Sequence, residues 1–358
     1  MSNGSSHDFF LNRWGRSAFG QLFARLPERV RLYGYYQLLV STDFPEVLHI
    51  ESTNACNAKC IMCPRDEMTR RIGIMSMELF KKIMDEAATK PQVKEIHLHG
   101  FGEAPIDKNL VKKLEYAKQK GIRKTYFVTT ANLLTEEISK GLILGGLDGI
   151  KFSFYGATKE TYERIHQRLD FDTTVRNVEA FFRVRRSLGR KNPRVTFQFV
   201  PQKENLEEKD LIVSKWQPYF DPEIGDHFED FNLHNWIDGR SYNPLSFSNR
   251  FRKTCSHPFR LIQIHWNGDV APCVYDFDGT IKLGNLAQPD QTLYKIWNSP
   301  AYRRLRQIHR RRIYEREPTC NKCDQLRVPT QEGSWKLETG EISVEGLKQK
   351  EEVTVGAG

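Results

Sequence analysis

The sequence contains no long hydrophobic run. A membrane-spanning helix needs about 18 consecutive apolar residues, and no stretch of this 358-residue chain approaches that length. The first ten residues, MSNGSSHDFF, also lack the basic flank, the apolar stretch and the small-residue cleavage site of a secretory signal. We therefore expect a cytoplasmic protein.

Cysteine is scarce and unevenly distributed. An odd number of cysteines in a chain without a secretory signal argues against a disulfide framework. The seven cysteines form a group of three and a group of four: Cys56, Cys60 and Cys63, then Cys255, Cys273, Cys320 and Cys323. The 191 residues between the two groups contain none, and the division leaves no thiol over.

The composition is that of a folded protein with a local excess of positive charge. Hydrophobic residues make up 39% of the chain and charged residues 28%, which excludes a disordered or collagen-like protein. The net charge of +9 has one clear source, because residues 302–316 contain seven arginines and one glutamate. Tyr302, Leu305, Ile308 and Ile313 are spaced as one helical stripe, which predicts a solvated arginine face. An anion site is the alternative, and we do not expect nucleic acid as a partner.

Strand-like and helix-like segments alternate from residue 46 onward. Such alternation implies parallel βα units, and six units suit a partial (βα)6 TIM-like barrel. In this α/β architecture the chemistry lies at the C-terminal ends of the strands. The expected strands are 47–50, 93–99, 125–129, 149–155, 194–200 and 228–233. The expected helices are 77–88, 108–120, 136–144, 159–188 (with an interruption near 170–172) and 206–216.

The pattern changes after about residue 236. Residues 261–266 form a predicted strand, Asn267-Gly268 is a type I′ turn signal, and 269–275 return as the partner strand that carries Cys273. We therefore expect a small C-terminal domain of β-hairpin and helices. The predicted domains are a helical N-terminal extension (1–45), the barrel (46–235), the small domain (236–330) and an acidic tail (331–358). The extension either packs on the barrel or binds a membrane surface or a partner.

The first group of cysteines follows the first predicted strand with the spacing C-x3-C-x2-C. Structural zinc sites and fully ligated iron–sulfur clusters use four protein ligands. Three local thiolates therefore leave one coordination position free for a cofactor or a substrate. The segment Glu51–Asn54 before Cys56, together with Pro64 after Cys63, resembles the radical S-adenosylmethionine (SAM) superfamily.

This resemblance implies that Cys56, Cys60 and Cys63 hold a [4Fe–4S] cluster whose free iron binds the methionine part of SAM. One electron from the cluster then cleaves SAM and gives a 5′-deoxyadenosyl radical. Members of the family often have an aromatic residue before the third cysteine. Met62 stands there in this chain, and it can still pack near the adenine.

Further matches follow at the ends of the next predicted strands. Gly100–Glu103 resembles the family's Gly-Gly-Glu segment, which implies that Glu103 accepts a hydrogen bond from the SAM amino group. Thr129–Asn132 resembles the Thr-Asn-Gly segment, and Ser153 matches a position near the SAM ribose or carboxylate. The resemblance therefore implies a SAM site built from Met62, Gly100, Gly102, Glu103, Asn132 and Ser153.

The second group of cysteines combines Cys255, Cys273 and a C-x2-C pair at Cys320 and Cys323. Four cysteines alone also fit zinc. Alongside the first group, they resemble the SPASM/twitch domain of radical SAM enzymes, which carries auxiliary [4Fe–4S] clusters. Four ligands imply one fully ligated auxiliary cluster, whose natural role is electron transfer.

The resemblance implies a radical SAM oxidoreductase with SAM and two [4Fe–4S] clusters as cofactors. We expect a two-electron oxidation of a small polar molecule, such as a sugar, an aminocyclitol or a nucleoside-type alcohol. The auxiliary cluster accepts an electron, and flavodoxin or ferredoxin supplies the reductant. A peptide maturase or an epimerase is one alternative, and a non-catalytic zinc- or nucleic-acid-binding protein is another. A thiol-quenched epimerase is disfavoured, because all seven cysteines are assigned to clusters.

The substrate side of the site is less defined. Polar and aromatic candidates gather near the sixth predicted strand, which we place at the mouth of the barrel: Asp226, His227, Glu229, Asp230, His234, Trp236 and, from the small domain, Tyr275. One of the ionisable groups can take a proton from the substrate, but a solvated acidic loop explains them equally well, and we assign no base. His97 and His99 share one face of the second strand, where a structural role is favoured over a substrate contact.

Overall fold

The computed structural model describes residues 43–231, 233–236, 247–252 and 254–329. The predicted N-terminal extension and acidic tail lie almost entirely outside these residues. Within them, no helix is long and apolar enough to cross a membrane.

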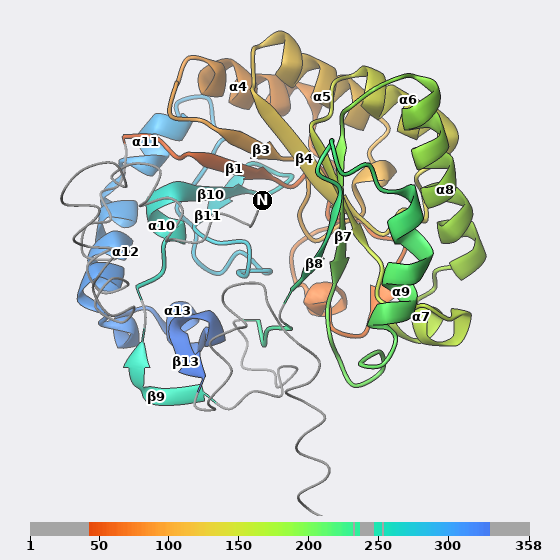
Figure 1. Ribbon diagram of the computed structural model, residues 1–358. Coiled ribbons are helices and arrows are strands. Elements are labelled where there is room, and N and C mark those ends of the chain that lie inside the picture. The colour runs from red at the N-terminus through yellow and green to blue at the C-terminus, as the bar shows by residue number, and fades with distance from the viewer. Residues whose placement is uncertain (1–42, 232, 237–246, 253, 330–358) are drawn as a thin grey trace, which may run out of the picture.

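Six parallel strands form a partial barrel, as the alternation of segments predicts. In spatial order they are β1 (Val47–Ile50), β3 (Glu95–His97), β4 (Lys124–Thr129), β5 (Gly149–Ser153), β7 (Arg194–Phe199) and β8 (His227–Asp230). Helices cover the outer face of the sheet (Figure 1): α4 (Met77–Ala88), α5 (Leu110–Gln119), α6 (Glu136–Leu144), α7 (Lys159–Ile165), α8 (Phe171–Ser187) and α9 (Lys209–Trp216). Apolar side chains that alternate along the strands form the core beneath these helices.

The helices begin where the sequence offers a cap. The side chain of Ser76 accepts a hydrogen bond from the Leu79 backbone at the start of α4, and Thr135 caps α6 in the same way. The predicted helix at 159–188 is interrupted, as expected. It is divided into α7 and α8 by β6 (His166–Gln167), and Asp170 caps the second helix. The interruption therefore precedes the predicted one by a few residues.

The C-terminal hairpin continues the barrel sheet, which the sequence pattern does not predict. Its first strand, β10 (Leu261–Ile264), pairs in parallel with β1 at the edge of the barrel. The strands β11 (Asp269–Ala271) and β12 (Gly284–Asn285) follow, so the sheet has nine strands in the order β12-β11-β10-β1-β3-β4-β5-β7-β8. The remaining elements of this region are β9 (Phe247–Arg252), α10 (His257–Arg260), α11 (Leu293–Trp297), α12 (Pro300–Arg311), α13 (Pro318–Lys322) and β13 (Arg327–Pro329).

The hairpin turn differs from the predicted type I′ turn. Gly268 has a positive φ of 88°, whereas a type I′ turn requires a positive φ at Asn267 as well, and Asn267 has none. The backbone of Gly268 donates to the carbonyl of His265 (2.9 Å), and His265 donates to Asp269 (2.8 Å). The loop is therefore longer than a two-residue turn, and Gly268 has a left-handed backbone conformation. The returning strand ends at Ala271, so Cys273 lies beyond the strand rather than on it.

The arginine-rich helix α12 is amphipathic, as expected, with one exception. Tyr302, Leu305 and Ile308 are buried, while Arg303, Arg304 and Arg310 are exposed. Arg306 instead lies in the interior. Its guanidinium stacks over the ring of Trp297 (4.2 Å) and donates to the carbonyl of Pro258 (2.8 Å).

Candidate functional site

The three clustered cysteines lie on the loop that follows the C-terminal end of β1. Cys60 belongs to β2 (Lys59–Cys60), which pairs with β6, and the backbone of Cys63 donates to the carbonyl of Cys60 (3.0 Å). Burial, the carboxylate of Glu103 and the negative charge of Cys63 raise the pKa of the Cys56 thiol to about 12. Burial, with Cys63 and Cys56, likewise raises the pKa of Cys60. The fold therefore brings the three predicted ligands together in a sheltered place, where a cationic metal centre would stabilise the thiolates.

Glu103 lies next to these cysteines and is almost completely buried, with 3% of its surface exposed. Its carboxylate accepts hydrogen bonds from the Thr129 hydroxyl and from the backbone and hydroxyl of Thr130 (3.1 Å each). Burial raises its pKa, and these hydrogen bonds oppose the shift. Among the described residues no lysine, arginine or histidine forms an ion pair with Glu103. Buried carboxylates are normally paired, so this side chain fits a ligand that brings its own cation.

The two glycines of the Gly100–Glu103 segment allow close packing against the cysteine loop. A Cβ atom at Gly102 would lie 2.3 Å from the carbonyl oxygen of Thr53, and one at Gly100 would lie 2.6 Å from Glu51 Cγ. The backbone of Glu103 donates to the carbonyl of Ala55 (2.9 Å). These contacts give both glycines a packing role, and a direct contact with SAM stays a prediction.

The remaining residues of the predicted SAM site surround the same loop. The amide of Asn132 accepts from Asn57 (3.1 Å) and donates to the hydroxyl of Thr174 (3.1 Å), so it connects the cysteine loop to α8. Met62 packs against apolar neighbours beside Cys60, and Ser153 lies at the end of β5 with 9% of its surface exposed. The structure brings these residues to one end of the barrel, and their contacts with SAM stay predictions.

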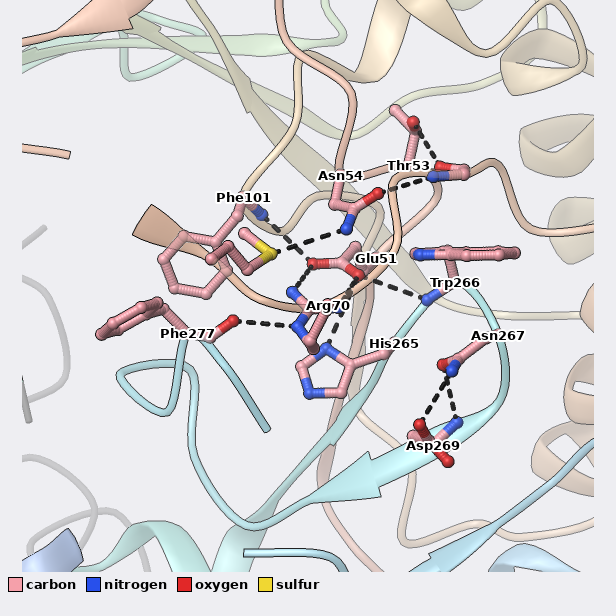
Figure 2. A network of polar contacts seen from close by, with 12 residues as sticks. Glu51, Thr53, Asn54, Arg70, Phe101, His265, Trp266, Asn267, Asp269 and Phe277 are labelled. Carbon is pink, nitrogen blue, oxygen red and sulfur yellow. Dashed lines mark hydrogen bonds and ion pairs between the residues drawn. The ribbon is translucent and has the colours of Figure 1, made fainter. Parts of the chain in front are cut away.

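Glu51 joins the cysteine loop to the C-terminal hairpin (Figure 2). Its fully buried carboxylate receives two hydrogen bonds from Arg70 (2.8 and 2.9 Å) and one from the backbone of Trp266 (3.3 Å). His265 Nδ1 lies 3.6 Å away, and the backbone of Phe101 also donates to the carboxylate (3.4 Å). These contacts hold the backbone around Phe101 against the end of β1 and against the C-terminal hairpin.

The Glu51 network predicts a dependence of stability on acid. Burial alone would raise the pKa of Glu51, but His265 and Arg70 outweigh it and lower the pKa from 4.5 to about 2. A depressed carboxylate pKa stabilises the fold above the unfolded value and loses this contribution as the pH falls toward 2. We expect wild-type protein to lose about 3 kcal/mol of unfolding free energy from this group between pH 5 and pH 2. Urea titrations across that range should show a flatter pH profile for Glu51→Gln, and equal slopes would contradict the assignment.

The four C-terminal cysteines surround one cavity of about 190 Å³, which His257, Tyr275 and His309 also line. A single water molecule needs about 10–15 Å³, so the cavity has room for a group of several atoms. Burial and the neighbouring Cys255 raise the pKa of Cys323 to about 12. Within the described residues, no three Cys, His, Asp or Glu side chains converge closely enough to hold a single metal ion, in either cysteine group.

A chain of aromatic rings connects the two cysteine groups. Trp236 Nε1 donates to the carbonyl of Met62 (2.8 Å), beside Cys63. The His234 ring lies 4.1 Å from Trp236 and 4.5 Å from Tyr275, measured between centroids. The backbone of Tyr275 in turn donates to the sulfur of Cys273 (3.3 Å). His234 is 8% exposed, and its Nδ1 has no hydrogen-bond partner among the described residues.

The placement of Asp226 and His227 at the mouth of the barrel is wrong. Because β8 begins at His227, both residues lie at the N-terminal end of the strand, opposite the cysteine loop. Asp226 is buried and forms an ion pair with Arg185 (2.5 Å). The other two acids are also paired: Glu229 with Lys151 (2.5 Å), and Asp230 with Lys209. A cluster of acids in the sequence does not reveal which end of a strand each acid occupies.

His97 and His99 both point into the barrel, together with His49 of β1. His97 contacts His49 through their ring nitrogens, and its Nε2 lies 3.2 Å from the carboxylate of Glu95. The rings of His97 and His99 are stacked, with 5.8 Å between centroids. Burial and the nearby Lys151 lower the pKa of His99 to about 3, so this imidazole is neutral. The contacts of His97 support its predicted structural role.

Sequence reasoning missed two histidines that contact the cysteines. His166 Nδ1 lies 3.1 Å from Cys60 Sγ, although 106 positions separate the residues. His257 Nδ1 lies 3.2 Å from Cys273 Sγ. Only the second had a signal in the sequence, because His257 follows Cys255 by two positions.

The comparisons with known families agree with this arrangement. Residues 50–212 match the radical SAM superfamily, and residues 255–324 match SPASM, an iron–sulfur cluster-binding domain. The chain therefore contains a radical SAM domain followed by a C-terminal SPASM domain. A radical SAM domain binds SAM and a [4Fe–4S] cluster, and a SPASM domain binds auxiliary iron–sulfur clusters.

Two curated relatives align with most of the chain. A tungsten-containing aldehyde ferredoxin oxidoreductase cofactor-modifying protein of Pyrococcus furiosus is 24% identical, over 77% of this chain and 86% of its own. An S-adenosyl-L-methionine-dependent 2-deoxy-scyllo-inosamine dehydrogenase of Niallia circulans is 19% identical, over 80% and 95%. Among solved structures, Streptococcus suis SuiB bound to precursor peptide SuiA has a TM-score of 0.60 at 15% identity, covering 90% of this chain and 77% of that one. This last likeness shows the shared fold.

The buried carboxylate of Glu103 gives a testable prediction for SAM binding. If Glu103 receives the SAM ammonium, Glu103→Gln removes a charge-assisted hydrogen bond worth about 1.5–3 kcal/mol. We expect SAM affinity to fall by about 10- to 150-fold, measured by calorimetry on cluster-loaded protein. Glu137→Gln, at an exposed position on α6, should bind SAM like the wild type. Unchanged affinity in Glu103→Gln would exclude the proposed contact.

Proposed function

We propose that this protein is a radical SAM oxidoreductase that removes two electrons from a small polar alcohol, such as a sugar, an aminocyclitol or a nucleoside-type alcohol. Bound SAM supplies the 5′-deoxyadenosyl radical that takes a hydrogen atom from the substrate. The substrate then loses a proton, and its remaining electron passes to the auxiliary cluster. The relative from Niallia circulans, a dehydrogenase that depends on SAM, supports this choice.

In this proposal the two cysteine groups have different tasks. Cys56, Cys60 and Cys63 hold the cluster that binds SAM. Met62, Gly100, Gly102, Glu103, Asn132 and Ser153 form the surroundings of SAM. Cys255, Cys273, Cys320 and Cys323 hold the auxiliary cluster, and flavodoxin or ferredoxin provides electrons.

The observation that carries the proposal is the ring of four cysteines around one cavity. Four thiolates ligate a [4Fe–4S] cluster completely, which suits electron transfer rather than substrate binding. The aromatic chain of Trp236, His234 and Tyr275 lies between this cavity and the other cysteine group. A substrate held beside these rings would lie between its oxidant and its electron acceptor.

The interior of the barrel supports a polar substrate. Lys151 on β5 and Glu229 on β8 form an ion pair across β7, so both side chains point to the inner face of the sheet. Near the C-terminal ends of β5 and β7, the Tyr155 hydroxyl donates to the amide oxygen of Gln198 (3.0 Å). Hydroxyl and amino groups of a ligand need such polar partners when they leave water.

The test is substrate-dependent SAM cleavage. Oxygen-free protein with both clusters is reduced and incubated with SAM and candidate sugars, aminocyclitols, nucleosides or peptides, and 5′-deoxyadenosine is measured beside the product mass. An alcohol that accelerates cleavage and loses two mass units supports the proposal. An unchanged mass with an inverted centre indicates an epimerase, and a modified peptide indicates a maturase. Either result would overturn the proposed oxidation of a small alcohol.

A further inference from the structure

In each cysteine group a sulfur contacts an imidazole, which is fully buried for His166 and half-buried for His257. In the first group, Nδ1 of His166 lies 3.1 Å from Cys60 Sγ. In the second, Nδ1 of His257 lies 3.2 Å from Cys273 Sγ. Both distances suit an N–H···S hydrogen bond. The same nitrogen of the ring is used in both places, although the two histidines come from unrelated elements.

The fold around His166 holds this contact firmly. His166 begins β6, whose antiparallel pairing with β2 places it directly opposite Cys60. The residue is fully buried, and its ring packs between Tyr155 (4.8 Å) and Tyr162 (4.7 Å). A side chain enclosed in this way loses little freedom when it binds the sulfur.

The partners of His166 also define which nitrogen carries the proton. Nε2 of His166 is buried and has no hydrogen-bond partner among the described residues. A buried N–H without an acceptor is costly, so a neutral ring keeps its single proton on Nδ1. A cysteine sulfur bound to iron has no proton and can only accept. The imidazole is therefore the donor whenever iron is present.

His257 contacts two cysteines of the second group. Its backbone N–H donates to Cys255 Sγ (3.4 Å), while its ring reaches Cys273. The ring stacks beside Tyr275 with 5.8 Å between centroids. His257 thus lies on the side of the cavity where the aromatic chain from the other cysteine group ends.

We propose that His166 and His257 each donate a hydrogen bond to a cluster sulfur and thereby raise the reduction potential of their own cluster. This inference rests on the proposed assignment of the seven cysteines. Reduction adds negative charge to the cluster and its sulfurs, so a donor stabilises the reduced form more than the oxidised form. His166 would then make the SAM-binding cluster easier to reduce, and His257 would make the auxiliary cluster a better electron acceptor.

The experiment measures both reduction potentials in full-length protein that contains both clusters, by titration followed with electron paramagnetic resonance. Added SAM changes the spectrum of its own cluster and so distinguishes the two. We expect His166→Phe, which keeps an aromatic ring but no donor, to lower the reduced-to-oxidised ratio of the SAM-binding cluster about tenfold at a fixed potential. For a one-electron couple this is about 59 mV. His257→Phe should do the same to the auxiliary cluster only.

A second pair of variants separates the hydrogen bond from packing. Asn and Leu have nearly the same size, but only Asn carries an N–H near the position of Nδ1. At both positions the Asn variant should keep a higher potential than the Leu variant. Equal potentials in Asn and Leu variants with full iron content, or a shift of both clusters in any one variant, would overturn the inference. If the potentials shift as expected but no alcohol is oxidised, the hydrogen bonds stand and the proposed function fails.

Discussion

Cys60→Ala is expected to abolish SAM cleavage, whereas Cys323→Ala should retain SAM cleavage and lose oxidation of the substrate. In the proposed function, the first variant removes a ligand from the cluster that holds SAM, and three cysteines leave no spare ligand there. The second would remove a ligand from the proposed auxiliary cluster, so radical formation would continue without its electron acceptor. Two clusters contain about eight iron atoms, and we expect each variant to retain about half of the iron.

The measurements are iron content, 5′-deoxyadenosine and oxidised product in oxygen-free protein. Lys59 and Lys322 are exposed and each lies next to one of these cysteines, so Lys59→Ala and Lys322→Ala serve as matched controls. Both controls should keep the full iron content and both activities. Unchanged SAM cleavage in Cys60→Ala would refute the role of the first cysteine group.

Asp226→Ala is expected to cost about 3–5 kcal/mol of unfolding free energy, because it leaves the charge of Arg185 buried without its partner. Asp226 receives two hydrogen bonds from Arg185 (2.9 and 2.5 Å), and the backbones of Val195 (2.8 Å) and Asp221 (3.0 Å) also donate to it. All four contacts tie α8, β7 and the segment before β8 together. Urea or thermal unfolding measures the loss, and the exposed Glu223→Ala should change stability little.

Two further results separate this structural role from proton transfer. The double variant Asp226→Leu with Arg185→Met should recover much of the lost stability, because apolar residues often replace a buried ion pair without net cost. Folded Asp226→Ala protein should oxidise substrate at the wild-type rate at low temperature, since Asp226 lies at the end of β8 away from the cysteine loop. A loss of turnover without a loss of stability would instead make Asp226 the base that accepts the substrate proton.

Local patterns in the sequence predicted most of the barrel. Alternating strands and helices are encoded within a few residues, and the structure confirms them. The side chains of Ser76 and Thr135, which cap α4 and α6, also act within one helical turn. The pairing of β10 with β1 is different. The sequence of Leu261–Ile264 predicts a buried strand, and all four of its residues are buried. No local signal, however, predicts that this strand pairs with β1. Strand pairing between segments more than 200 residues apart depends on how the whole chain packs.

The site shows the same division between local and distant information. Spacing within the sequence predicted which cysteines belong together, because metal ligands often cluster along the chain. It could not predict the contact of His166 with Cys60, which depends on the antiparallel pairing of β6 with β2. The sequence also led to a wrong placement of Asp226, because it does not show whether an acid precedes or follows the strand until the start of the strand is known.

The continuous sheet has a consequence for how electrons move in this protein. The strand that leads to the first cysteine loop and the strand that leads to the Cys273 hairpin are immediate neighbours, and the backbone of Glu51 donates to the carbonyl of Ile264 (2.8 Å) at their shared end. Direct main-chain pairing thus joins the two strands that lead toward the two cysteine groups. Under the proposed assignment of the cysteines, main-chain pairing would therefore fix the distance over which an electron tunnels between the two clusters.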